Sequence, residues 1–197
     1  MAYKAAIIGC HGVGKTTLVK RLSNNFKVFG EVAINSFMGH DSFLSEVKIL
    51  VDNILLNKKV AETRADCISD RFAFLDAIIY SEAFYRLGWI NTEQLKAIYS
   101  IVNNSKHEWV YPEKIIVMND SKDLIMNNIA KRARNKKLNE TDEEFLGMTL
   151  QMFNDFYTGH INFQFLKPEI KKKIDSIPKF EIKCYEDIRN VLDILNN

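Results

Sequence analysis

Glycines, a lysine and two threonines are gathered between Gly9 and Thr17 in the order glycine, four residues, then Gly-Lys-Thr. The stretch follows a short apolar run and leads into a segment with helical spacing, which is the setting of a phosphate-binding loop. Its glycines allow a sharp turn that points successive N–H groups at phosphate oxygens, beside the positive end of a new helix. We expect Lys15 to reach the outer phosphates and Thr16 to ligate Mg²⁺. The residues expected to bind ATP are Gly9, His11, Gly12, Val13, Gly14, Lys15, Thr16 and Thr17.

Two acidic residues close predicted strands and would lie beside this loop. The stretch 65–71 ends with the pair Asp70 and Arg71, and Glu31 lies near the end of the stretch 27–32. Catalytic groups of an open α/β sheet project from the carboxyl ends of its strands. We expect Asp70 to hold Mg²⁺ directly or through water, and Glu31 to accept a proton from an attacking hydroxyl. Arg71 could pair with Glu31, contact the transferred phosphoryl group or form an ordinary salt bridge.

Five cations fall within the seven residues 131–137. Such a run is usually a solvated helix end whose charge favours the helix dipole. Here it follows a predicted strand and helix, where a closing lid could lay Arg132 and Arg134 over a triphosphate. We therefore expect a helical lid over about residues 128–142.

Apolar runs and helical stripes alternate along the chain, and they define the elements that must position these groups. Strands are expected at about 4–8, 27–32, 65–71, 114–118 and 180–182. Helices are expected from the loop to residue 22 and at about 41–61, 72–87, 92–102, from 122, 141–157 and 186–195. This alternation predicts an α/β fold with a five-stranded parallel sheet, helices on both faces and one domain over residues 1–197.

The composition is that of an ordinary globular protein. Hydrophobic residues make up 47% of the 197 residues, and the formal net charge of +2 gives no overall argument for binding nucleic acid or membrane. The three cysteines are far apart and contain no CxxC pair, which argues against a disulfide framework or a zinc site. No stretch approaches the ~18 apolar residues of a membrane span. We expect a soluble, cytoplasmic protein.

From the first strand to about Tyr157, the motifs resemble those of the deoxynucleoside kinases, within the wider group of phosphate-loop nucleoside and nucleotide kinases. Phe29-Gly30-Glu31-Val32 is similar to the Glu-Pro-Val segment that carries the catalytic base in that family. Asp70-Arg71-Phe72 is similar to a motif whose acid serves Mg²⁺ and whose arginine steadies the catalytic carboxylate. Residues 128–134 resemble the lid pattern Arg-x-x-x-Arg-x-Arg. The resemblance implies a three-layer phosphate-loop kinase fold.

The same resemblance implies where the acceptor would bind. Residues 42–46 are similar to the segment whose glutamine hydrogen-bonds the base, and Asp76 falls where the family often places a base-reading aspartate. Tyr80 falls where an aromatic ring stacks on the base. The residues expected to contact the acceptor are Glu46, Asp76 and Tyr80, with Phe37 and Tyr85 as weaker aromatic candidates.

Three departures from the family pattern affect the choice of acceptor. Glu46 replaces the usual glutamine and so loses the amide donors, which means that base recognition must differ or that this carboxylate reads something else. Asn128 replaces the first lid arginine. Lys136 and Lys137 stand where the family tends to have glutamates, which would suit a more anionic acceptor.

Together these observations predict an ATP- and Mg²⁺-dependent kinase that phosphorylates the 5′-hydroxyl of a deoxynucleoside, nucleoside or similar acceptor. The residues expected to act in catalysis are Lys15, Glu31, Arg71, Arg132 and Arg134. A nucleotide or polynucleotide kinase with an anionic, even nucleic-acid, acceptor stays open, as do a ribosylnicotinamide-kinase-like enzyme and a nucleotide-dependent switch. A homodimer could form through the apolar stripe between Phe43 and Leu55, although core packing explains that stripe more simply.

Overall fold

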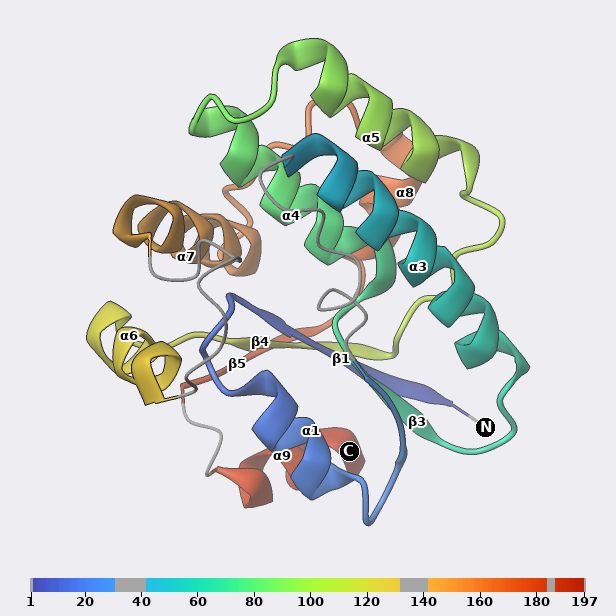
Figure 1. The fold of residues 1–197 in the computed structure, drawn as a ribbon. Helices are drawn as coiled ribbons and strands as arrows, with labels where there is room; N and C mark the ends of the chain where they lie inside the picture. Colours follow the sequence, from blue (N-terminus) through green and yellow to red (C-terminus); the bar gives the residue numbers. More distant parts are fainter. Residues whose placement is uncertain (1, 31–41, 132–141, 184–186, 197) are drawn as a thin grey trace.

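A five-stranded parallel sheet forms the centre of the protein. The computed structural model describes residues 2–30, 42–131, 142–183 and 187–196 (Figure 1). The strands are β1 (Tyr3–Gly9), β2 (Lys27–Phe29), β3 (Cys67–Asp70), β4 (Lys114–Met118) and β5 (Lys179–Ile182). Their order across the sheet is β2-β3-β1-β4-β5, and every neighbouring pair is parallel.

The strand register brings the two predicted phosphate-site segments together. Ile7 of β1 is paired with Asp70 of β3, and Gly9 of β1 is paired with Met118 of β4. Since parallel strands end at the same edge of the sheet, the loop after β1 begins beside the last residue of β3. The central strand is buried on both faces from Ala5 to Gly9, as its continuous apolar sequence predicts.

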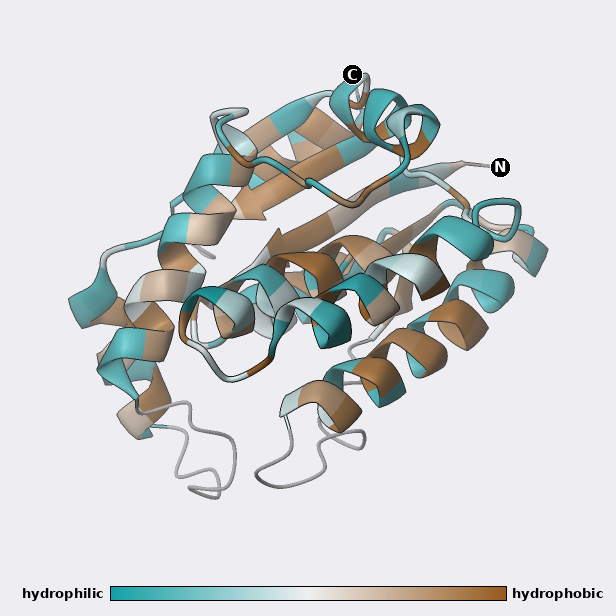
Figure 2. Ribbon diagram, turned by 90° about the horizontal axis from the view of Figure 1, so that it is seen from above, coloured by the Kyte–Doolittle hydropathy of each residue, from teal (hydrophilic) through white to brown (hydrophobic). Residues whose placement is uncertain are grey.

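Helices cover both faces of the sheet. Figure 1 shows α1 (Lys15–Leu22) and α9 (Ile188–Asn196) on one face. The other face carries α3 (Ser42–Glu62), α4 (Ala73–Arg86), α5 (Thr92–Asn104) and α8 (Pro168–Asp175). The helices α6 (Lys122–Lys131) and α7 (Glu143–Tyr157) complete the described elements. The strands are mostly brown in Figure 2, whereas the helices show an apolar and a polar side, so the core lies between the layers.

One continuous core links the elements from β1 to α9, with fully buried side chains such as Ile7, Leu18, Phe74 and Tyr99. Not all of the apolar stripe on α3 belongs to it. Leu50 is buried, but Val51 and Leu55 are 45% and 57% exposed. Core packing therefore accounts for only part of that stripe.

The α/β class, the five parallel strands and the helices on both faces are confirmed. The helix α8 was not expected, although Pro168 in its first turn and the buried pair Ile170 and Ile174, one turn apart, carry its signal. The strand β2 ends at Phe29, earlier than expected. Within the described ranges, no helix is both long enough and apolar enough to cross a bilayer.

Candidate active site

The loop between β1 and α1 has the backbone of a phosphate-binding turn. Gly12 has φ +83° and Gly14, which caps α1, has φ +102°, conformations that L side chains rarely adopt. A Cβ on Gly12 would also lie 2.8 Å from both Ile125 and Ile129 of α6. The Asn128 side chain of the same helix donates to the Gly12 carbonyl at 3.2 Å. The loop is therefore held against α6 by close packing and by a hydrogen bond.

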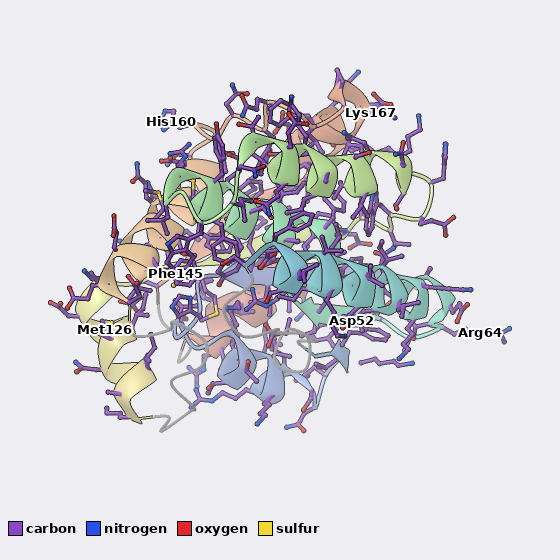
Figure 3. The ribbon with its side chains drawn as sticks, turned by 45° about the horizontal axis from the view of Figure 1, so that its top comes forward. Asp52, Arg64, Met126, Phe145, His160 and Lys167 are labelled. Carbon is purple, nitrogen blue, oxygen red and sulfur yellow. The ribbon has the colours of Figure 1, made fainter. Side chains whose placement is uncertain are left out.

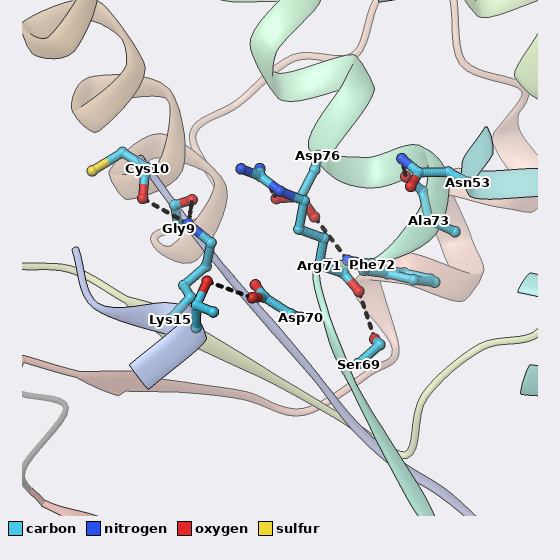
Figure 4. A network of polar contacts seen from close by, with 11 residues as sticks. Gly9, Cys10, Lys15, Asn53, Ser69, Asp70, Arg71, Phe72, Ala73 and Asp76 are labelled. Atoms are coloured by element: carbon cyan, nitrogen blue, oxygen red, sulfur yellow. Dashed lines mark hydrogen bonds and ion pairs between the residues drawn. The ribbon is translucent and has the colours of Figure 1, made fainter. Parts of the chain in front are cut away.

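The side chain of Lys15 lies along the inside of this loop and is only 4% exposed. Its ammonium donates to the carbonyl oxygens of Gly9 at 2.8 Å and Cys10 at 2.7 Å (Figure 4). Burial raises the pKa of the Cys10 thiol to about 11, even though Lys15 and Arg71 act in the other direction. Cys10 is thus a neutral, packed side chain rather than a nucleophile.

A hydrogen bond joins the loop to the end of β3. The Thr16 hydroxyl donates to Asp70 Oδ2 at 2.9 Å, and Asp70 is 1% exposed. The second carboxylate oxygen, Oδ1, is buried and has no hydrogen-bond partner among the described residues. A buried carboxylate oxygen beside a threonine hydroxyl is a donor set that suits a hard divalent cation such as Mg²⁺. The residues present therefore fit the expected metal.

The turn after β3 holds Arg71 in a strained conformation, with φ +92°. Its N–H donates to the Ile7 carbonyl at 2.8 Å, and its own carbonyl accepts from the Ser69 hydroxyl at 2.5 Å (Figure 4). The Tyr3 hydroxyl lies 2.5 Å from Ser69 Oγ and supplies the other hydrogen bond of that group. Such strain persists only where the surroundings over-determine the backbone.

The next residues of the turn are fixed in the same way. Ala73 has φ +29°, and its carbonyl accepts from the Asn53 side chain of α3 at 2.9 Å. Phe72 N–H, directly before α4, donates to Asp76 Oδ2 at 2.8 Å. Buried side chains from β3, α3 and α4 thus set the direction in which Arg71 points.

The guanidinium of Arg71 forms a buried ion pair with Asp76, with Nη1 3.2 Å from Oδ1 (Figure 4). It also lies over the ring of Tyr80, 5.3 Å from the ring centre. Burial raises the pKa of Asp76, while Arg71 and the Phe72 N–H oppose that rise. Both oxygens of Asp76 accept hydrogen bonds from the protein itself.

Glu46 on α3 is a further buried acid near Arg71. It is 4% exposed, and its Oε2 is buried without a hydrogen-bond partner in the described part of the chain. Burial raises the pKa of Glu46 to about 8, Arg71 opposes the rise and the charge of Asp76 adds to it.

Aromatic rings connect the loop to the helices above it. The His11 ring stacks on Phe145 of α7, with centroids 5.2 Å apart, and lies 6.5 Å from the Tyr80 ring. Figure 3 shows Phe145 among crowded side chains, whereas Arg64 points away from the molecule past the end of α3. The side chain of His11 therefore packs against aromatic rings.

The structure brings together most of the described residues that the sequence analysis selected. The residues gathered around the end of β3 are Lys15, Thr16, Glu46, Asp70, Arg71, Asp76 and Tyr80. Val13 is buried and Thr17 is exposed at the start of α1. Tyr85 lies in the last turns of α4, where its hydroxyl accepts from Thr92 at 3.4 Å, so the structure does not gather it with the others. Glu31, Phe37, Arg132 and Arg134 lie outside the described residues.

Sequence reasoning missed two side chains that hold backbone carbonyls in place, Asn53 and Ser69, and it marked Asn128 only as a departure from the lid pattern. Each bonds a carbonyl of a turn or loop, at Ala73, Arg71 and Gly12. No motif marks such residues, because the carbonyl they meet is set by the fold.

Comparisons with known proteins agree on the architecture. A family model described as deoxynucleoside kinase matches residues 5–193. Two structures of M. mycoides deoxyadenosine kinase, with bound dATP and with bound dCTP, match at 19% identity with TM-scores of 0.77 and 0.73. The match covers 98% of this chain and 99% or 98% of theirs, respectively. A third structure of that enzyme, with dCMP and a flexible dCDP bound, matches over 98% of both chains with TM-score 0.77 and 19% identity. A search of curated proteins finds no match.

Proposed function

Because the chain belongs to the deoxynucleoside kinase family, we propose that it transfers the terminal phosphoryl group of ATP to the 5′-hydroxyl of a deoxynucleoside. As a member of that family it is a nucleoside kinase, and thus a phosphotransferase. The observation that carries the more specific proposal is the Thr16–Asp70 hydrogen bond, which joins the phosphate loop to β3 directly before Arg71. The family match favours a nucleoside acceptor over a nucleic-acid end or a ribosylnicotinamide.

On the donor side, the loop N–H groups, the start of α1 and the Lys15 ammonium bind the phosphate oxygens. All three present positive charge or N–H dipoles inside a buried loop, where electrostatic attraction is stronger than in water. Thr16 and Asp70 would hold Mg²⁺, which supplies charge neutralisation to the phosphates when bound. Phosphoryl transfer needs mainly this positioning and neutralisation from the protein.

On the acceptor side, Arg71 orients the group that receives the phosphoryl, with its guanidinium fixed by Asp76 and by the Tyr80 ring. We assign Glu31 as the base that takes the proton of the acceptor hydroxyl, and Arg132 and Arg134 as further charges on the phosphates. These three assignments rest on the sequence motifs. Replacing Glu31 by Gln should lower turnover about a hundredfold or more and leave ATP binding nearly intact.

The acceptor is expected to carry adenine or cytosine. The related M. mycoides structures hold dATP, dCTP or dCMP, which carry these two bases. The buried groups Glu46, Arg71 and Tyr80 offer hydrogen bonds and an aromatic face to such a base.

The experiment that tests the function is an assay of ATP consumption with deoxynucleosides, nucleosides, nucleoside monophosphates and nicotinamide riboside. We expect turnover with at least one deoxynucleoside and a loss of about a hundredfold or more in Asp70→Asn, the range of a lost electrostatic group. The control is Asp175→Asn, which removes an exposed carboxylate paired with Lys171 on α8. Hydrolysis of ATP that no acceptor accelerates would contradict the proposal.

We also propose that the exposed apolar face of α3 joins two copies of the chain. Val51 and Leu55 are exposed on the helix that also carries Glu46. Sedimentation equilibrium should show a dimer that Leu55→Glu dissociates, and a monomer at all concentrations would refute this assignment.

A further inference from the structure

Among the described residues, Arg71 has a buried acid near it on each of two helices, besides Asp70 directly before it in the chain. Asp76 on α4 is bonded to the guanidinium, and Glu46 on α3 lies within electrostatic range of both. The two acids are 1% and 4% exposed, so water screens neither charge. One guanidinium can balance one carboxylate, and a second negative charge at this depth would be strongly disfavoured.

The hydrogen bonds show which acid keeps the charge. Asp76 Oδ1 accepts from Arg71 and Oδ2 accepts from the Phe72 N–H, so a proton on either oxygen would displace a donor. Glu46 Oε2 has no hydrogen-bond partner among the residues described, so that oxygen can carry a proton without breaking any contact described here. Lys15 and Asp70 also act on Asp76 at longer range. The proton therefore belongs on Glu46.

We propose that Glu46 recognises the acceptor's base as a neutral carboxylic acid, with one O–H donor and one carbonyl acceptor side by side. This inference rests on the proposed function, because it takes the base to lie beside Arg71. It also explains how Glu46 can stand where the family has a glutamine. A neutral carboxyl group offers the same donor and acceptor pair as a glutamine amide, whereas a carboxylate can only accept.

The protonation state determines which base edges fit. Adenine and cytosine present a ring nitrogen that accepts a hydrogen bond next to an amino group that donates one, and a neutral acid satisfies both. A carboxylate would face the ring nitrogen lone pair with a second acceptor and lose that bond. Guanine suits both states, because its O6 and N1–H match the neutral acid and its N1–H and 2-amino group match the carboxylate. The preference for deoxyadenosine over deoxyguanosine should therefore fall as the pH rises.

The test compares kcat/KM for deoxyadenosine and deoxyguanosine from pH 7 to pH 9 in the whole protein with saturating ATP and Mg²⁺. The ratio of the two values cancels any pH effect on phosphoryl transfer that is common to both nucleosides, and the charged groups near the site, Arg71, Asp76, Lys15 and Asp70, are present with both. With a Glu46 pKa of about 8, the ratio should fall about tenfold between these two pH values. The variant Glu46→Gln keeps a permanent donor and acceptor, so its ratio should stay constant over the same range.

The matched control is Glu82→Gln. Glu82 is also 4% exposed, and it lies on α4, but its carboxylate accepts from Tyr99 at 2.5 Å and the nearby cation that acts on it is Arg86 rather than Arg71. This variant should retain the pH-dependent ratio of the wild type. A constant ratio in the wild type, or the same tenfold fall in Glu46→Gln, would overturn the role of Glu46. An enzyme that phosphorylates no nucleoside would instead contradict the proposed function, so the two failures are distinguishable.

Discussion

The carboxyl group of Glu46 couples folding to proton binding. Its pKa is about 4.5 as an ordinary side chain and about 8 in the folded protein, because burial disfavours the charge. The folded state therefore binds this proton more tightly than the unfolded state. The resulting stabilisation is fully present below pH 4.5 and is lost as the pH rises towards 8.

Replacing Glu46 by Gln removes this titration, so the free energy of unfolding of the wild type should fall relative to that of the variant between pH 5 and pH 8. The change is on the order of a few kcal/mol for a shift of this size in a buried group. Urea denaturation of both proteins at several pH values measures it. A difference between the two proteins that does not vary with pH would show that Glu46 is ionised throughout.

Ser69 acts on the site indirectly, by holding Arg71 in position. Its hydroxyl holds the carbonyl of Arg71, so Ser69→Ala releases a strained backbone and leaves the Tyr3 hydroxyl without its partner. We expect a loss of about 1–3 kcal/mol in stability. Turnover should fall about tenfold or more because Arg71 is no longer held in position.

Ser81→Ala is the control for Ser69→Ala. Ser81 is equally buried, but it donates to the Ala77 carbonyl within α4, away from the turn. Denaturation and steady-state kinetics of both variants separate a loss of stability from a loss of positioning. Equal turnover in the two variants would remove Ser69 from the positioning network.

At the scale of elements, the contact between the phosphate loop and α6 sets what the loop can tolerate. A Cβ at Gly12 would overlap Ile125 and Ile129, and the φ of +83° adds strain of roughly 1–2 kcal/mol for a non-glycine residue. In Gly12→Ala the loop must move away from α6. We expect ATP affinity to fall at least about tenfold and stability to fall by more than this strain alone.

Gly147→Ala provides the matched comparison. Gly147 lies in α7, where an added Cβ would meet nothing within 4 Å, so alanine should stabilise the helix by about 0.5–1 kcal/mol. Calorimetric titration with ATP and urea denaturation measure both variants. If Gly12→Ala bound ATP as the wild type does, the loop would not need its packing on α6.

For the molecule as a whole, local patterns were enough to predict the sheet, the phosphate loop and the acid that ends β3. The loop motif alone predicts the turn that binds phosphate. The alternation of apolar runs and helical stripes predicts a parallel sheet, whose strands end at the same edge. That reasoning placed Lys15, Thr16 and Asp70 together, as the structure does.

The remaining details depend on contacts between distant segments. That Asp76 reads the base stays a prediction, but its bonds to the Arg71 guanidinium and the Phe72 N–H follow from the fold and not from any motif. The raised pKa of Glu46 could not be predicted from the sequence either, because it follows from the burial of this side chain in the folded protein, close to Asp76. Helix α8 was missed because its short stripe of Ile170 and Ile174 is difficult to separate from a loop.

The buried thiol of Cys10 can report when the phosphate loop opens. The thiol is fully buried and its pKa is about 11, so a thiol reagent can modify it only after the surrounding structure opens. The third cysteine, Cys184, is first replaced by Ser. Iodoacetamide then modifies Cys10, whose rate reports opening of the loop, and Cys67, which is buried in β3 and whose rate reports opening of the sheet. A bound nucleotide should slow modification of Cys10 more than that of Cys67. Equal slowing would mean that the loop and the sheet open together.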